Sequence, residues 1–311
     1  MIDNENLNPR ETLKLVGYDK KFSFIKSLFL KNNLPKVILF SGEKGIGKST
    51  FVSHLMHFFF DKANYDLERK IIVKKDMFHN QYTKNLFPNI YYLDNSNMQN
   101  IKIDDMRKLK NDLSKTSLNK NKTFIIMDNV ESFNQNSLNA ILKIIEEPGT
   151  NNYFFLIYNH TNLLPETIKS RCLEIKILLS KITKIEIIDF LIKQLNCKVT
   201  INKNLINLSP GLFIRINKIL NDKNIDVDKN ILLNFKKILD LYKKEKKTIY
   251  QDLLIFMTHY HFQDRKLKKL ISTEKFIEYK YFVLENINDF FRFNFNQNTL
   301  LNCIEKKFIN E

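Results

Sequence analysis

The feature that most constrains this 311-residue chain is a short glycine-rich segment at residues 42–49. It reads Gly-Glu-Lys-Gly-Ile-Gly-Lys-Ser and matches the pattern G-x-x-x-x-G-K-S/T at every fixed position. An uninterrupted apolar run at 37–40 precedes it, and apolar residues with helical spacing at 48–60 follow it. A glycine-rich turn between a buried strand and a helix predicts a phosphate-binding loop (P-loop). The predicted binding residues are Gly42, Gly45, Ile46, Gly47, Lys48, Ser49 and Thr50.

The residue types of this loop indicate how phosphate would be held. Backbone N–H groups and the positive end of the helix dipole surround the phosphates, Lys48 reaches the outer phosphates, and Ser49 ligates magnesium. Asp128 ends the apolar run 123–127 and is expected to hold Mg²⁺ through its water shell. The sequence therefore predicts ATP or ADP with Mg²⁺ as the cofactor.

The residue after Asp128 bears on hydrolysis. It is Asn129, and an amide cannot accept a proton from an attacking water. Glu131 is the nearest carboxylate that could substitute. We expect nucleotide binding, with hydrolysis by the chain itself weak or absent.

Strand-like and helix-like segments alternate up to about residue 180, which predicts an α/β fold with a parallel sheet and flanking helices. Beyond that point only helical patterns follow, so we expect a domain at 1–178, a small helical domain at 179–222 and a helical C-terminal domain at 223–311. Residues 221–224 are the expected linker. Strands are predicted at 37–40, 90–93, 123–127, 153–158 and 173–178, and helices at 19–33, 48–60, 103–113, 138–145, 181–195, 211–220, 231–242, 249–262 and 274–293.

Composition excludes several other classes of protein. The start of the chain is polar and acidic and the longest apolar runs are short, so we expect a cytoplasmic protein with no export signal and no membrane span. The three cysteines are far apart, which argues against a disulfide framework or a cysteine zinc site. The net charge of +16 comes from lysines spread over the whole chain. A solvated surface explains most of them, and direct DNA contact stays open.

A second group of motifs carries a resemblance to a known family. Ser170-Arg171-Cys172 follows Leu-Leu-Pro-Glu-Thr-Ile-Lys at 163–169, and residues 136–148 form an N-x-x-x-x-I-L-K-type helix ending in Glu-Glu-Pro. Together with the P-loop, these segments resemble the bacterial clamp-loader family of AAA+ proteins over residues 9–178. The resemblance implies that Arg171 acts on a neighbouring subunit's ATP and that Asn159 is the sensor-1 polar residue. Ser209–Arg215 is similar to the sensor-2 helix start, but Leu212 occupies the usual arginine position and leaves the role of Arg215 in doubt.

The resemblance also implies architecture and partners. The first domain would be a P-loop AAA+ domain, the second a helical lid and the third an all-α collar for oligomerisation. The pattern is closest to the delta-prime type of subunit, which donates an arginine finger in trans while a sliding clamp is loaded for DNA replication by DNA polymerase III. The implied partners are gamma/tau and delta subunits, the clamp and primer-template DNA. Zinc is not expected, because no cysteine precedes Cys172.

Two alternatives stay open. One is a gamma/tau-type ATPase motor; the missing glutamate after Asp128, the missing cysteines and the absence of a C-terminal extension argue against it. The other is a P-loop kinase of a small metabolite, which would leave the S-R-C segment and the helical last third unexplained. Turnover by the isolated chain would distinguish them, because a motor or a kinase turns over ATP alone.

Overall fold

A computed structural model of the chain describes residues 8–94, 103–116 and 121–309. The chain divides into two compact units, which are described separately. The first comprises Met1–Ile187 with Ser209–Gly211, and the second comprises Ile188–Leu208 with Leu212–Glu311. The three-domain division at residues 178 and 222 stays a prediction.

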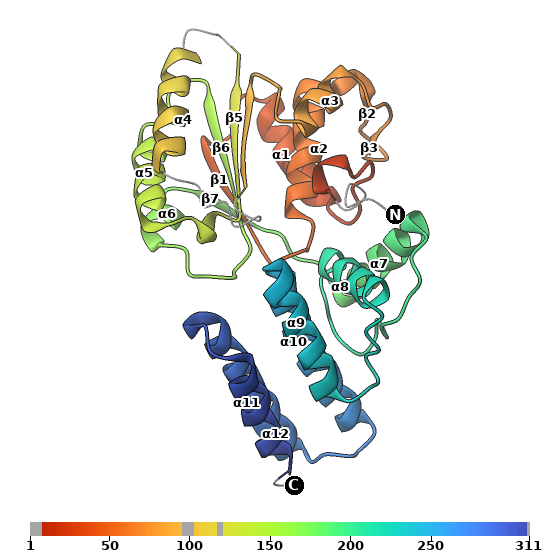
Figure 1. Ribbon diagram of the computed structural model, residues 1–311. Helices are drawn as coiled ribbons and strands as arrows, with labels where there is room; N and C mark the ends of the chain where they lie inside the picture. Colours follow the sequence, from red (N-terminus) through yellow and green to blue (C-terminus); the bar gives the residue numbers. More distant parts are fainter. Residues whose placement is uncertain (1–7, 95–102, 117–120, 310–311) are drawn as a thin grey trace. The chain divides into compact units, whose positions relative to one another are not determined.

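The first unit is built on a parallel five-stranded sheet with the order β4-β5-β6-β1-β7 (Figure 1). In register, Ser41 lies beside Tyr158, and Asp128 lies beside Ile157. The carboxyl ends of the central strands therefore meet at one edge, where sheets of this kind bind ligands. The strands are β1 Val37–Ser41, β4 Ile90–Asp94, β5 Thr123–Asp128, β6 Asn152–Tyr158 and β7 Leu173–Lys176.

Successive strand residues point to opposite faces, so each strand feeds two apolar layers. On one face, Phe40, Phe124 and Phe155 pack with the residues of α1 and α2. On the other face, Leu39 and Leu156 pack with the residues of α4, α5 and α6 (Figure 1). The helices are α1 Asp19–Leu30, α2 Lys48–Phe60, α3 Met77–Thr83, α4 Ile103–Thr116, α5 Gln135–Glu146 and α6 Glu166–Lys169.

The predicted fold class is confirmed, with a P-loop parallel sheet flanked by helices and a helical remainder. Several predicted boundaries differ from those of the structure, and two elements end earlier than predicted. α1 ends at Leu30 instead of residue 33, because Asn32 takes a left-handed conformation with φ 55°. β7 ends at Lys176 instead of residue 178, although the Ile177 N–H still bonds to the Ser41 carbonyl at 2.7 Å.

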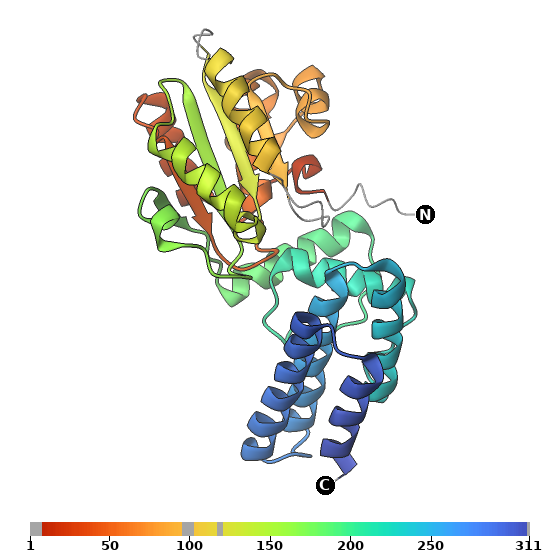
Figure 2. The ribbon, with the colours of Figure 1, turned by 60° about the vertical axis from the view of Figure 1, so that its left-hand side comes forward.

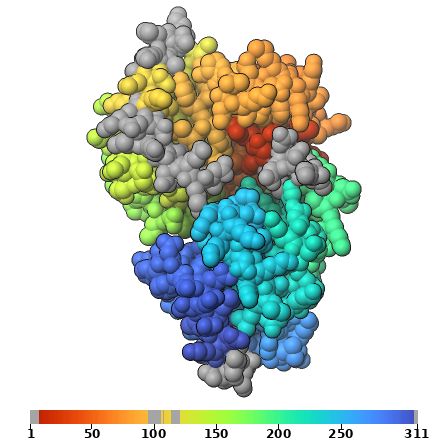
Figure 3. Space-filling model, in the orientation of Figure 1, coloured from red at the N-terminus to blue at the C-terminus, as the bar shows by residue number. Residues whose placement is uncertain are grey.

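A segment that the sequence patterns did not predict follows α2. It contains the two-residue strands β2 Tyr65–Asp66 and β3 Ile71–Ile72, which pair antiparallel. With α3 it forms the orange surface in Figure 3 and exposes Val73, Met77 and Leu86. Short 3₁₀ helices lie at Pro9–Glu11, Lys62–Asn64 and Val130–Ser132.

The second unit is helical. α9, α10, α11 and α12 pack side by side as a bundle (Figures 1 and 2), and the Ser272 side chain accepts the Lys275 N–H at the start of α11. α8 extends to Asp222, so the first two residues of the predicted linker 221–224 are helical. Among the described residues, no helix is long and apolar enough to cross a membrane. The helices are α7 Lys181–Leu195, which begins in the first unit, α8 Pro210–Asp222, α9 Ile231–Glu245, α10 Ile249–Leu267, α11 Thr273–Phe293 and α12 Gln297–Ile309.

Candidate nucleotide site

The glycine-rich loop connects β1 to α2, as the sequence predicts. Gly47 is the N-cap of α2 and has φ 101°, a conformation that favours glycine. Gly42 approaches β7's end so closely that an added Cβ would lie 2.4 Å from the Ile177 carbonyl oxygen. The loop conformation requires glycine at both positions. Because both are glycine, the loop can turn tightly and present its N–H groups at the start of a helix.

Lys48 is the buried cation of the loop. Its side chain is 3% exposed, and its Nζ donates to the carbonyl oxygens of Gly42 and Glu43, each at 2.7 Å. Burial lowers the pKa of Lys48 to about 8, and the carboxylate of Asp128 partly opposes the shift. An ammonium whose hydrogen bonds to the described residues go to neutral carbonyls is suited to receiving an anionic group such as phosphate.

Ser49 and Asp128 lie together at the predicted magnesium position. The Ser49 hydroxyl donates to Asp128 Oδ2 at 2.5 Å, and the Tyr92 hydroxyl donates to the same oxygen at 2.7 Å. Burial raises the pKa of Asp128, while these two hydroxyls lower it. A hydroxyl and a carboxylate fit magnesium, which takes oxygen ligands and few protein groups.

The remaining predicted loop residues frame the site. Ile46 is buried, and its carbonyl accepts a hydrogen bond from the Tyr18 hydroxyl, while Gly45 accepts the Gly211 N–H at 2.8 Å. Thr50 is half-buried in the first turn of α2.

Asn159, the predicted sensor residue, lies beside Asn129. Its Nδ2 donates to Asn129 Oδ1 at 2.8 Å, and its backbone N–H donates to Glu131 Oε1 at 2.9 Å. Thr161 donates to the same Glu131 oxygen through its hydroxyl at 2.8 Å. Glu131 is 5% exposed and so connects the segments that follow β5 and β6. These donors engage Oε1, whereas Oε2 is buried and has no hydrogen-bond partner among the described residues.

Arg171 lies just after α6 on the surface. Its side chain is 39% exposed, and its guanidinium bonds to Glu146 Oε1 at 2.7 Å and to the Thr167 carbonyl at 2.9 Å. Glu146 is the last residue of α5, so Arg171 is held between α5 and α6. The contacts described for Arg171 do not include the P-loop residues of its own chain.

The sequence patterns did not predict two contacts that side chains make with the P-loop, nor the contact of Tyr92 with Asp128. Ser209 donates to the Lys44 carbonyl at 2.5 Å, and the buried Lys184 ammonium bonds Glu43 at 2.7 Å. Tyr92 was assigned only to a strand, although its hydroxyl reaches Asp128. The Ser-Pro-Gly segment at 209–211 was a signal for the first contact; no local pattern indicated Tyr92.

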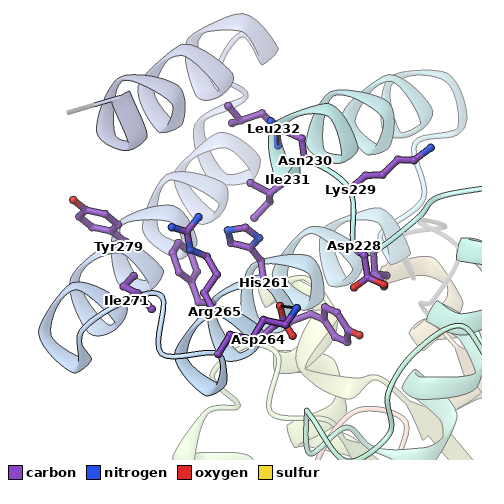
Figure 4. A pocket seen from close by; sticks show the side chains of 14 residues that line it. Asp228, Lys229, Asn230, Ile231, Leu232, His261, Asp264, Arg265, Ile271 and Tyr279 are labelled. Atoms are coloured by element: carbon purple, nitrogen blue, oxygen red, sulfur yellow. Dashed lines mark hydrogen bonds and ion pairs between the residues drawn. The ribbon is translucent and has the colours of Figure 1, made fainter. Parts of the chain in front are cut away.

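The second unit contains a cavity of about 450 Å³ between the start of α9, the end of α10 and α11 (Figure 4). Its charged lining includes Lys268 and Asp264, which pair with each other at 2.7 Å. None of the predicted site residues lines it. In the described part of the chain, no three His, Cys, Asp or Glu side chains gather as metal ligands.

Comparison with known proteins gives partial relatives. The delta' subunit of DNA polymerase III from Buchnera aphidicola subsp. Schizaphis graminum is 39% identical over 71 residues, which are 22% of this chain and 21% of the relative. The gamma subunit of the same organism is 23% identical over 170 residues, which are 54% of this chain and 45% of the relative. The chain thus spans less than half the length of the curated relatives it matches.

Solved structures are similar at a low level. A gamma subunit-related protein of DNA polymerase III from Thermotoga maritima has 16% identity and a TM-score of 0.42, with 91% of this chain and 97% of that chain covered. The sequence profile of the family described as DNA polymerase III, delta subunit matches residues 17–183. Because this match spans more than half of the chain, the chain belongs to the DNA polymerase III, delta subunit family.

Proposed function

We propose that this chain is a delta-prime-type clamp-loader subunit, which holds a nucleotide at its P-loop and donates Arg171 to the site of a neighbouring ATPase subunit. One observation carries the proposal. The site has a complete set of groups for phosphate and magnesium, whereas the carboxylate needed to activate water is replaced by the amide Asn129.

Nucleotide binding follows from the chemistry of the loop. Lys48 exchanges its contacts with two backbone carbonyls for the outer phosphates of ATP or ADP, and the α2 N-terminus lies against the phosphate charge. Ser49 and Asp128 are the residues that would hold Mg²⁺, the second through water. When bound, magnesium neutralises charge on the phosphates.

Weak hydrolysis follows from the residues after β5. Asn129 has no basic group, and its amide oxygen already accepts the Asn159 Nδ2–H. Glu131 Oε1 accepts from Asn159 and Thr161. A general base must lie within hydrogen-bond reach of the water that it activates, and the Oε1 atom of Glu131 is already held by these two donors while Oε2 is buried.

The exposure of Arg171 supports its action in trans. A guanidinium that stabilises a transferred phosphoryl group must reach a partner's nucleotide, so it has to lie at the surface. Glu146 and the Thr167 carbonyl limit the rotamers of the side chain in advance, which reduces the entropy lost on docking.

The partners we propose are the gamma/tau and delta subunits, together with the sliding clamp and primer-template DNA that such a complex handles, in the cytoplasm. A gamma/tau-type motor is the second candidate, because the gamma relatives align over longer segments than the delta' relatives. The absence of a base after Asp128 favours the first candidate.

Binding and turnover by the purified full chain test the nucleotide part. Calorimetry with Mg-ADP and Mg-ATP should detect binding that Lys48→Ala abolishes and that Lys74→Ala, at an exposed lysine outside the site, preserves. ATP turnover by the chain alone should stay at background. Turnover that Lys48→Ala removes would make the chain an ATPase in its own right and overturn the proposal.

A further inference from the structure

β4 carries two consecutive tyrosines with different surroundings. Tyr91 packs against the core layer of α4 and α5, and Tyr92 packs against the layer of α1 and α2. Both side chains are partly buried. Only Tyr92 therefore lies on the face of the sheet that also carries the P-loop helix.

The Tyr92 hydroxyl reaches the predicted magnesium position. It donates to Asp128 Oδ2 at 2.7 Å, the same oxygen that accepts the Ser49 hydroxyl at 2.5 Å. Two donors from two elements thus fix one carboxylate oxygen. Ser49 is itself a candidate magnesium ligand, whereas the Tyr92 hydroxyl donates to the carboxylate that would hold the metal's water.

The ring of Tyr92 is fixed in turn by Arg10. The guanidinium carbon lies 4.5 Å from the ring centroid, a distance typical of a cation–π contact. Arg10 also donates to the Tyr82 carbonyl at 3.3 Å and to the Asn85 side chain. Arg10 thus packs over the ring whose hydroxyl donates to Asp128.

We propose that Tyr92 is a positioning residue for the magnesium–nucleotide complex, because it holds the Asp128 carboxylate toward Ser49. The inference rests on the proposed nucleotide binding. Groups that orient a metal-binding carboxylate typically change metal affinity by about 10–100-fold when they are removed. Tyr92 acts through Asp128, so it affects binding that depends on magnesium and leaves metal-free binding unchanged.

The test uses the full chain and the variants Tyr92→Phe and Tyr91→Phe. The second variant removes a hydroxyl from the adjacent residue on the other face of the sheet and is the matched control. ADP affinity is measured by calorimetry with Mg²⁺ and with excess chelator, and the ratio of the two affinities is the readout. Thermal melting of each variant without nucleotide reports folding.

We expect Tyr92→Phe to reduce the ratio of ADP affinity with Mg²⁺ to ADP affinity with chelator by at least about 10-fold. Its ADP affinity in the presence of chelator should stay at the wild-type value. Tyr91→Phe should keep the wild-type ratio. An unchanged or larger ratio in Tyr92→Phe would overturn the inference and leave the proposed function intact. Failure of the wild type to bind ADP in either condition would overturn the proposed function, and the inference with it.

Discussion

Asp128 and Asn129 follow one another at the end of β5 and have different consequences. Asp128 accepts two hydroxyls at the predicted magnesium position, whereas Asn129 bonds to Asn159 in the next loop. In the proposed function, the first residue holds the magnesium of the nucleotide, and the second offers no base to activate water. We therefore expect this pair of residues to allow nucleotide binding with little hydrolysis.

Glu131 is expected to stabilise the fold instead of activating water. Glu131→Ala removes the acceptor for Thr161 and for the Asn159 N–H, so we expect a loss of about 1–3 kcal/mol in the free energy of unfolding. Urea denaturation measures this loss, with Glu68→Ala as an exposed control that should stay within about 0.5 kcal/mol. Equal stabilities of the two variants would contradict the structural role.

Lys48 is expected to reduce stability in the absence of nucleotide. Its ammonium is buried against neutral carbonyls, and its pKa is lowered to about 8, so charge at this position opposes folding. Lys48→Met should therefore keep or raise the melting temperature of the nucleotide-free chain while abolishing ADP binding. A lower melting temperature in calorimetry would mean that Lys48 stabilises the fold.

At the level of elements, the start of α8 supports the P-loop. The Gly211 N–H bonds to the Gly45 carbonyl, and a Cβ on Gly211 would lie 2.8 Å from that oxygen. Gly211→Ala should displace the loop and destabilise the chain by about 1–3 kcal/mol, with weaker ADP binding. Urea denaturation and calorimetry check both effects. Arg215→Ala, an exposed position of α8, is the stability control, and equal behaviour of the two variants would refute the contact.

The two buried histidines of α2 should make the folded state less stable as the pH falls below about 6.5. His54 and His57 are fully buried, and burial lowers their pKa values to about 4 and about 3. An unfolded histidine has a pKa of about 6.5, so the unfolded state binds protons first as the pH falls. The stabilisation is complete above about pH 6.5 and decreases toward the folded pKa values.

Urea denaturation between pH 7 and pH 5 should show this decrease, before most carboxylates titrate. His57→Asn should flatten the pH dependence, whatever its effect on stability at pH 7. The matched control His160→Asn changes an exposed histidine and should keep the wild-type slope. Identical slopes for the wild type and His57→Asn would contradict the assignment.

Elements with a strong local pattern could be predicted from the sequence. The five strands, the P-loop and most helices follow from apolar runs and helical spacing, and the predicted strands lie in one sheet. The strands β2 and β3 have two residues each and offer no run to detect. Tyr92 and Asp128 are far apart in the sequence, and only the parallel pairing of β4 with β5 brings them together.

At the scale of the whole molecule, the family match and the candidate nucleotide site both lie in the first unit. The matched residues 17–183 lie within that unit and include the P-loop, Asn159 and Arg171. The helical second unit lies outside the match, so its role in oligomerisation stays a prediction. The net charge of +16 is compatible with DNA contact but does not locate it.

ATPase activity of a reconstituted clamp loader, with sliding clamp and primed DNA, tests the central claim most directly. Loaders containing wild type, Arg171→Ala, Lys48→Ala or the surface control Arg69→Ala are compared. Arginine fingers contribute about 10³–10⁵ in rate where they have been measured in GTPases, so Arg171→Ala should reduce turnover at the neighbouring site severely. Near-normal activity is expected with Lys48→Ala and Arg69→Ala. Full ATPase activity of the loader that contains Arg171→Ala would contradict the account. So would loss of activity in the loader that contains Lys48→Ala.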